Sequence, residues 1–466
     1  MNSMNSIALP MVLDLFAQLF SQKTVQQWSQ DLQPSPDHPR GFYKRIFSLV
    51  VTLWYLIFQR LNADKTEDAV VKDIRRGGAD RLSPSPRQRL SKKVKSNATT
   101  SYDEARQRMP LGFLQWALRK MGEPIQAGLR QTRAATRSFQ LVDGSTLPIL
   151  RNARLALAYP PATNQHGSSD WCLMRVVVGF CALTGVVLSA TEGPLLVGEQ
   201  ALAWTLIAQA MADTVWIGDR NFGIWSVVAQ ALLHHQDVVV RLTQSRAARL
   251  TRGKIWVSGQ EEVVEWHRTK HDQIAPGTEA VQVKGRLIFV RVSREGRWVN
   301  LWLFTTLMDR EAFPISRVVE LYGWRWQAEV DFRYVKTSLE MEQLFVQSPE
   351  MARKEFYAGL IAYNLVRVVM AGAGDSQPNQ PGLRLSFSQV KRVLVFWLND
   401  WAKDWRSRKG NLAQKIEQLL AEAALQRLPT RKKPRPSEPR RVRRRSAKFP
   451  PLIGSRAAAR TKMTLS

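Results

Sequence analysis

Four side chains in one stretch of the chain have types and spacing that suit phosphate chemistry. Tyr322, Arg325, Glu329 and Lys336 follow the pattern Y-x2-R-x3-E-x6-K. An α-helix turns about 100° per residue, so these offsets would place all four within an arc of about 60°. A carboxylate on this face could bind a divalent metal ion while the cations beside it hold phosphate oxygens. A solvated stripe of i, i+4 ion pairs is the alternative interpretation of this pattern alone.

Two aspartates upstream decide between these interpretations. Asp143 follows an alternating apolar run at 138–142 and precedes a glycine, and Asp219 follows a second apolar run at 214–218. We therefore expect both carboxylates at the ends of strands, although an Asp-Gly pair after a strand is more often a plain turn. Together with Glu329 they make three carboxylates from separate segments. Such a set can hold two Mg²⁺ ions about 3.5–4 Å apart.

These motifs resemble those of a known protein family. Asp143-Gly-Ser-Thr, Gly218-Asp219-Arg220 and the Y-x2-R-x3-E-x6-K signature are similar to the three catalytic motifs of the DDE cut-and-paste transposases of bacterial insertion sequences, specifically the insertion-sequence-four family. The resemblance covers residues 139–370, in the family's order. It implies a ribonuclease-H-like catalytic core with a β-rich insertion between the second aspartate and the glutamate. It also implies that Asp143, Asp219 and Glu329 are the catalytic residues and the ligands of two Mg²⁺ ions, for which Mn²⁺ could substitute.

The resemblance further implies residues that contact DNA. Tyr322, Arg325 and Lys336 would hold phosphates near the bond that is cut, where charged hydrogen bonds are strongest. Arg241 and Arg246 lie near the positions where the family has phosphate-contacting basic residues after the second aspartate. Structural ion pairs would explain these two arginines nearly as well.

A tryptophan in the relatives stacks on a base flipped from the cleaved DNA end. Trp302 is the best match by position, and Trp298 is the second candidate. Stacking of a base on an aromatic ring contributes about 1–3 kcal/mol, enough to favour a distorted end. Packing in a hydrophobic core is the alternative for either residue.

Composition agrees with a partner that carries many negative charges. The chain has 466 residues and a formal net charge of +29, and nucleic acid is the polyanion that fits best. Its two cysteines, Cys172 and Cys181, make neither a disulfide framework nor a metal knuckle, which suits a reducing cytoplasm. The apolar run at 46–58 is shorter than the ~20 residues of a membrane helix. The start, at 7–20, reads as an amphipathic helix instead of a signal peptide.

One further spacing could suggest a metal site. His267 and His271 are separated as zinc ligands often are, yet no cysteine or carboxylate pattern accompanies them. We interpret this pair as unrelated to metal.

We interpret the chain as an α/β protein whose ribonuclease-H-like core is a mixed sheet with flanking helices. In the core we expect a strand that ends at Asp143, a hairpin around Gly185, a helix at 198–211, a strand before Asp219 and a strand at 238–243. We also expect helices at 46–58, 102–121, 350–371 and 387–402, and strands at 254–257, 262–266, 286–292 and 298–305. The predicted divisions are an N-terminal helical DNA-binding region (1–124), the first part of the core (138–244), a β-rich insertion (245–307), the rest of the core with the glutamate helix (308–372), a C-terminal helical region (373–430) and a basic, disordered tail (431–466).

The function that these features predict is DNA transposition. The protein would bind the terminal inverted repeats of its insertion sequence, cut there with Mg²⁺ and join the ends to target DNA. Its partners would be double-stranded DNA and a second copy in the paired-end complex, in the bacterial cytoplasm at the nucleoid and without a membrane. Two alternatives remain: a regulatory protein that binds the ends without cutting, and a nuclease with the same core that does not integrate.

Overall fold

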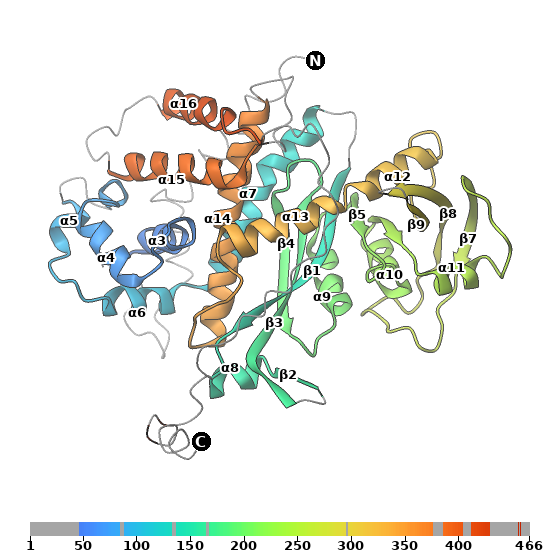
Figure 1. Ribbon diagram of the computed structural model, residues 1–466, viewed down its shortest axis with the longest axis horizontal. Helices are drawn as coiled ribbons and strands as arrows, with labels where there is room; N and C mark the ends of the chain where they lie inside the picture. The colour runs from blue at the N-terminus through green and yellow to red at the C-terminus, as the bar shows by residue number, and fades with distance from the viewer. Residues whose placement is uncertain are drawn as a thin grey trace.

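A mixed sheet with helices on both faces forms the centre of the computed structural model, and a group of helices packs at one side of it (Figure 1). The structure describes residues 46–83, 88–132, 137–164, 167–294, 297–375, 385–403 and 412–428, with Ser455 and Ala457. The predicted helix at 7–20 lies outside these residues, and so does the basic tail from 431 apart from those two.

The sheet of the described residues contains nine strands in the order β2-β3-β1-β5-β6-β9-β8-β7, and β4 also pairs with β3. The pairs β1–β5 and β5–β6 are parallel, whereas β1–β3, β3–β4, β6–β9, β9–β8 and β8–β7 are antiparallel. The strands are β1 (Ser138–Ile149), β2 (Pro161–Asn164), β3 (Gly167–Cys181), β4 (Val187–Pro194), β5 (Thr214–Gly218), β6 (Asp237–Arg241), β7 (Gln260–Trp266), β8 (Val283–Arg294) and β9 (Arg297–Thr305).

The subset β4-β3-β1-β5-β6 has β3 as its one antiparallel member. This is the predicted ribonuclease-H-like arrangement, and the predicted α/β class is confirmed. Its strands are apolar because helices cover both faces of the sheet. Leu141 and Val142, neighbours on β1, belong to separate hydrophobic clusters on opposite faces. The next residue, Asp143, shares the face of Leu141, which is the face of α13 and α14.

One strand runs further than the sequence indicated. β1 does not end at Asp143 but continues to Ile149, paired with β3 as far as Cys172. Its parallel partner β5 stops earlier, because the last paired residues are Leu141 and Ile217. The prediction of a strand end at Asp143 was therefore wrong for the strand, although Asp143 does follow the end of the parallel ladder.

The strands of residues 245–307 extend the same sheet. β9 pairs with β6, and β8 and β7 follow outward (Figure 1). Three of the four strands predicted here are present, but residues 254–257 form no strand. Whether this segment folds as an insertion of its own stays a prediction.

Most predicted helices are present, with one break. A single helix at 102–121 was wrong: Met109 is extended, and Pro110, which cannot donate a backbone hydrogen bond, separates α6 from α7. The helices are α3 (Leu49–Leu61), α4 (Glu67–Arg75), η1 (Asp80–Leu82), α5 (Leu90–Lys93), α6 (Thr100–Arg108), α7 (Leu111–Thr132), α8 (Ala153–Ala158), α9 (Glu199–Gln209), α10 (Trp225–Leu233), α11 (Gln244–Leu250), α12 (Ile315–Gly323), α13 (Trp326–Arg333), η2 (Tyr334–Ser338), α14 (Pro349–Asp375), α15 (Phe387–Lys403) and α16 (Leu412–Ala424).

Helix α14 joins the parts of the molecule. It contacts α3 and α7 on the N-terminal side, α15 and α16 on the C-terminal side, and β4 of the sheet. Among the described residues it contains the one segment, Pro349–Ala373, that is long and apolar enough to cross a membrane, and 94% of its most apolar window is buried inside the protein.

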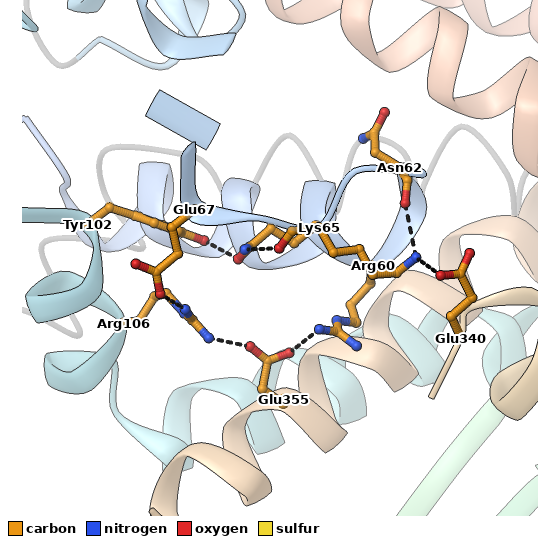
Figure 2. A network of polar contacts seen from close by, with 9 residues as sticks. Arg60, Asn62, Lys65, Glu67, Tyr102, Arg106, Glu340 and Glu355 are labelled. Carbon is orange, nitrogen blue, oxygen red and sulfur yellow. Dashed lines mark hydrogen bonds and ion pairs between the residues drawn. The ribbon is translucent and has the colours of Figure 1, made fainter. Parts of the chain in front are cut away.

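A buried charge cluster holds the N-terminal helices on α14 (Figure 2). Glu355 of α14 faces Arg106 of α6 through Oε1, at 2.6 Å, and Arg60 of α3 through Oε2, at 2.9 Å. Arg106 also pairs with Glu67 of α4. We call these four residues the Glu355 cluster. It brings three helices of the N-terminal region to one carboxylate of α14.

A second ion pair nearby lies at the surface. Lys65, in the connection between α3 and α4, contacts Glu340 at 2.8 Å (Figure 2). Glu340 follows η2 and has a left-handed backbone, with φ at 54°. The pair therefore links the N-terminal helices to the turn that leaves the glutamate helix.

Candidate active site

The two aspartates lie side by side where the parallel ladder ends. The parallel ladder ends at the pair Leu141 and Ile217, and Asp143 and Asp219 each follow two residues later. The two carboxyls are near enough for the charge of Asp219 to act on Asp143. One oxygen of Asp143 accepts a hydrogen bond from the Gly144 N–H at 2.9 Å. One oxygen of Asp219 accepts from the Asn221 N–H at 2.8 Å, which closes the turn before α10. Adjacent strand ends are where α/β sheets commonly bind ligands.

The glutamate comes from α13, which packs against β1. Glu329 Oε1 pairs with Arg325 Nη2 at 2.8 Å, one helical turn earlier, and the Glu329 side chain remains 38% exposed. Such an i, i+4 pair orients the carboxylate but leaves it accessible.

The three acids influence one another. The pKa of Asp143 is raised to about 6, first because the carboxyl is buried and then because Asp219 and Glu329 repel its charge. The Gly144 N–H and the Arg325 guanidinium oppose this rise. A carboxyl that is destabilised by neighbouring carboxylates marks a place where added positive charge would be stabilised.

An open groove of about 560 Å³ adjoins two of these acids. Asp143 and Glu329 line it together with Lys336, Arg333 and Pro148. Burial lowers the pKa of Lys336, while Glu342 and Asp143 nearby oppose that change. The groove therefore combines acids with cations, as a site for a metal-bound phosphate requires.

The segment with the Y-x2-R-x3-E-x6-K motif is not one regular α-helix. The predicted arc of about 60°, which assumes a continuous α-helix, was therefore wrong. Helix α12 ends at Gly323, α13 begins at Trp326, and η2 is a wide π-type turn that contains Lys336. Trp324 and Arg325 keep helical backbone angles between the two helices. The groove still brings Glu329 and Lys336 together, and Tyr322 lies near enough to influence Arg325.

The donor groups suit Mg²⁺ or Mn²⁺, because both prefer carboxylate oxygens. In the arrangement that the described residues adopt, no three acidic, histidine or cysteine side chains gather closely enough to hold one metal ion. Two features support a metal ion at this site: the candidate ligands are carboxylates, and Asp219 and Glu329 repel the charge of Asp143. Binding would require the carboxylates to draw closer together.

The candidate site lies in a part of the chain that matches a known protein family. Residues 134–365, which include all three acids, match the family model of the transposase DDE domain. The chain belongs to the DDE transposases.

Two relatives are insertion-sequence proteins, which confirms the predicted resemblance. The chain is 25% identical over 313 residues to the transposase InsG for insertion sequence element IS4 of Escherichia coli (strain K12), covering 63% of this chain and 64% of that protein. It is 25% identical over 286 residues to a probable transposase for insertion sequence element IS5377 of Geobacillus stearothermophilus, covering 60% and 68%. The chain thus spans slightly less than two thirds of the first relative.

A solved structure is more distant. A piggyBac transposase in a synaptic complex with hairpin DNA has a TM-score of 0.42 and 10% identity, over 94% of this chain and 88% of that one.

The two predicted phosphate-contacting arginines differ in their contacts. Arg246, on α11, donates to the carbonyl of Arg220 at 3.0 Å and so reaches the residue that follows Asp219. Arg241 ends β6, and its carbonyl lies so close to Gly223 that a Cβ there would come within 2.1 Å. Their contact with DNA stays a prediction.

The two tryptophans differ in exposure. Trp302 packs on Phe289 and Trp256, with ring centroids 4.4 Å and 5.4 Å away. Trp298 lies on the same strand, β9, and is 70% exposed. The structure thus supports the packing alternative for Trp302, while stacking on a base stays a prediction for either residue.

A fourth carboxylate near the site was missed. Glu199, at the start of α9, lies so close to Gly144 that a Cβ there would come within 2.6 Å of its carboxyl carbon. Its Oε2 accepts from Asn221 Nδ2 at 2.5 Å. Glu199 therefore connects the residues that follow Asp143 and Asp219. The residues next to Glu199 in the sequence do not indicate this contact.

A buried ion pair behind α13 was missed too. Asp331, about 200° around the helix from Glu329, contacts Arg367 of α14 at 3.2 Å, and both side chains are fully buried. Gln327 donates to Asp331 at 3.0 Å. Arg367 fills the space beside Gly185, where a Cβ would meet it at 1.5 Å. These contacts fix the back of α13, so that its other side faces the groove.

Proposed function

We propose that this protein is a transposase that binds the terminal inverted repeats of its insertion sequence, cuts the DNA there and joins the freed ends to a target. The observation that carries the proposal is that Asp143 and Glu329 line a groove together with Lys336 and Arg333, and that the charge of Asp219 acts on Asp143. The net charge of +29 supports a DNA partner.

Divalent metal ions, two Mg²⁺ or Mn²⁺, would be held by Asp143, Asp219 and Glu329. When bound, they supply Lewis-acid activation of the attacking oxygen and stabilise charge on the leaving oxygen. The chain itself orients the ligands: Arg325 holds one oxygen of Glu329, and the backbone at Gly144 and Asn221 holds one oxygen of each aspartate.

The reaction would be an in-line displacement at phosphorus in two stages. In the first, water attacks the phosphodiester at the element end, the P–O3′ bond breaks and a 3′-OH leaves. In the second, that hydroxyl attacks a phosphodiester of target DNA, or of the opposite strand to form a hairpin, and a new 3′ oxygen departs. Tyr322, Arg325 and Lys336 would hold phosphates beside the reacting bond.

The proposed partners are double-stranded DNA and a second copy of the chain in the complex that pairs the two ends. The bacterial cytoplasm, at the nucleoid, is the compartment where such DNA is found. Arg241, Arg246 and one of the tryptophans Trp302 and Trp298 would extend the contact with the end beyond the groove.

The test is a Mg²⁺-dependent assay of cleavage and joining on DNA that flanks this gene. Asp143→Asn, Asp219→Asn and Glu329→Gln should each abolish cleavage and leave end binding within about twofold, because only the metal ligands are lost. Glu320→Gln is the matched control, since Glu320 lies on α12 and pairs with Arg317 at the surface. It should cut like the wild type.

Other outcomes separate the alternatives. Retained cleavage in any of the three variants would refute the proposed site. Tight end binding without cutting by the wild type would favour a regulatory protein, and cutting without joining would favour a nuclease.

A further inference from the structure

One large aromatic side chain projects into solvent close to the catalytic groove. Phe345 is 73% exposed, whereas its neighbours Leu344 and Val346 are both buried. In an extended segment, successive side chains point to opposite sides. The burial of the two neighbours therefore forces the Phe345 ring outward.

The backbone at Phe345 is held against the end of β1. The Leu344 N–H donates to the carbonyl of Pro148 at 2.9 Å, and Leu344 forms a parallel bridge with Ile149. Further on, Asn152 Nδ2 donates to the carbonyl of Gln347 at 3.1 Å. Pro148 itself lines the groove that contains Asp143 and Glu329. The ring thus stands on a fixed support that begins at the groove's edge.

Positively charged side chains are exposed on the segment against which the backbone of Phe345 is held. Arg151 and Arg154 are exposed where β1 leads into α8, in the segment that runs beside 344–347. Arg333 and Lys336 lie at the groove. We call Phe345, Arg151 and Arg154 the Phe345 strip. A basic path with an aromatic ring is the composition that binds single-stranded nucleic acid, because the cations follow phosphates and the ring accepts a base.

We propose that the Phe345 strip guides the DNA strand that leaves the catalytic groove, and that the Phe345 ring stacks on an unpaired base of that strand. This inference rests on the proposed function and adds a DNA-contacting residue outside the fourfold motif. A base flipped or frayed next to the cut would find the ring within reach of the groove. Stacking on it would hold the strand open without reading its sequence.

Charge favours DNA over a protein partner at this place. Among the exposed side chains near the ring, Arg151 and Arg154 are cationic, Gln347 is neutral and Glu342 is anionic, and the adjoining groove adds Lys336 and Arg333. A protein interface would gain most from contiguous apolar surface, whereas a single ring between cations matches a base between phosphates.

The test measures binding to a forked duplex taken from the element end, labelled with fluorescein and with 2-aminopurine in its single-stranded arm. Ca²⁺ replaces Mg²⁺ so that binding is separated from cutting. Phe345→Ala should weaken binding of the fork about tenfold, leave binding of the blunt duplex within about twofold and abolish the change in 2-aminopurine fluorescence. Phe345→Trp should restore both signals, because stacking needs a ring and no particular one.

Phe396→Ala is the matched control. Phe396 is 77% exposed and lies on α15, which contributes no described residue to the lining of the groove, so its removal deletes a similarly exposed ring outside it. It should bind the fork like the wild type.

The outcomes keep the two proposals apart. Unchanged fork binding by Phe345→Ala, an equal loss in Phe396→Ala, or a change of oligomeric state without loss of stacking would overturn the role of Phe345 while cleavage by the wild type still upheld transposition. A wild type that bound neither fork nor duplex would overturn both.

Discussion

The Glu355 cluster and the candidate active site both bring carboxylates and cations together, but they treat the carboxylates differently. In the Glu355 cluster each oxygen of Glu355 faces an arginine, and Glu355, Arg60 and Arg106 are largely shielded from water. At the active site, among the described residues, Glu329 has one ion pair, and Asp143 and Asp219 accept hydrogen bonds from backbone N–H groups only.

The difference separates a structural charge from a functional one. A buried carboxylate that is neutralised within the chain stabilises one arrangement of helices, and its loss leaves other charges unpaired. A carboxylate that is only partly neutralised keeps its capacity for an external cation. Charge type and spacing alone do not distinguish the two, whereas the partners in the fold do.

The largest expected effect is on the structural cluster. Glu355→Gln should lower the free energy of unfolding by about 3–5 kcal/mol, because the mostly buried Arg60 would lose its ion pair with Glu355 and the mostly buried Arg106 would keep only its pair with Glu67. Urea denaturation measures it. Glu329→Gln is the comparison, and it should change stability by less than about 0.5 kcal/mol in metal-free buffer. Equal losses would end the distinction between the two regions.

We expect a metal ion to stabilise the folded protein only by binding at the active site. At a Mn²⁺ concentration of about 100 times its dissociation constant, the wild type should gain about 2.7 kcal/mol, seen as a higher melting temperature. Glu355→Gln should show the same gain from a lower baseline. Asp219→Asn should show little gain, and a full gain there would mean that the ion binds elsewhere.

Acid should act on the Glu355 cluster in a defined direction. Burial alone would raise the pKa of Glu355, but Arg60 and Arg106 outweigh it, so the pKa lies below its ordinary value. The stability from this ionised carboxylate is therefore complete above the unfolded pKa of about 4.3 and is lost as pH falls through the lower folded value. The slope is at most about 1.4 kcal/mol per pH unit for one proton. Glu355→Gln should lack this component in denaturation curves from pH 6 to pH 3.

The smallest effect is expected at the surface pair between the two regions. Lys65→Ala should cost about 0–1 kcal/mol, because Glu340 is mostly exposed and water screens the pair. Calorimetry at low and high salt would measure it, and salt should remove most of the difference. A loss as large as that of Glu355→Gln would assign Lys65 to the structural cluster.

The sequence predicts the structure best where a single local pattern of residues determines it. Asp219 follows a short buried strand because the turn that its own side chain closes ends β5, and both features are visible in the residues. Asp143 was harder: its glycine suggested a turn, but pairing with β3 keeps the backbone extended through it. β3 is a separate, later strand, so the residues next to Asp143 do not reveal this pairing.

The remaining features depend on contacts between distant segments. Nothing near Glu199 indicates that it meets Gly144, and nothing near Asp331 indicates Arg367. The wide turn at Lys336 likewise breaks the expected helical spacing without a proline or glycine to mark it. The roles of the individual site residues stay predictions until the cleavage assays are done.

The position of α14 also bears on how the chain folds during synthesis. α3 precedes α14 by about 290 residues, which a ribosome adds in about 15–60 s. Until then the apolar surfaces of α3 and α7 lack the helix that covers them, and Arg60 and Arg106 lack Glu355. Helices α3 and α7 are therefore made long before they reach their final packing, and chains released before α14 should be substrates for chaperones and proteases.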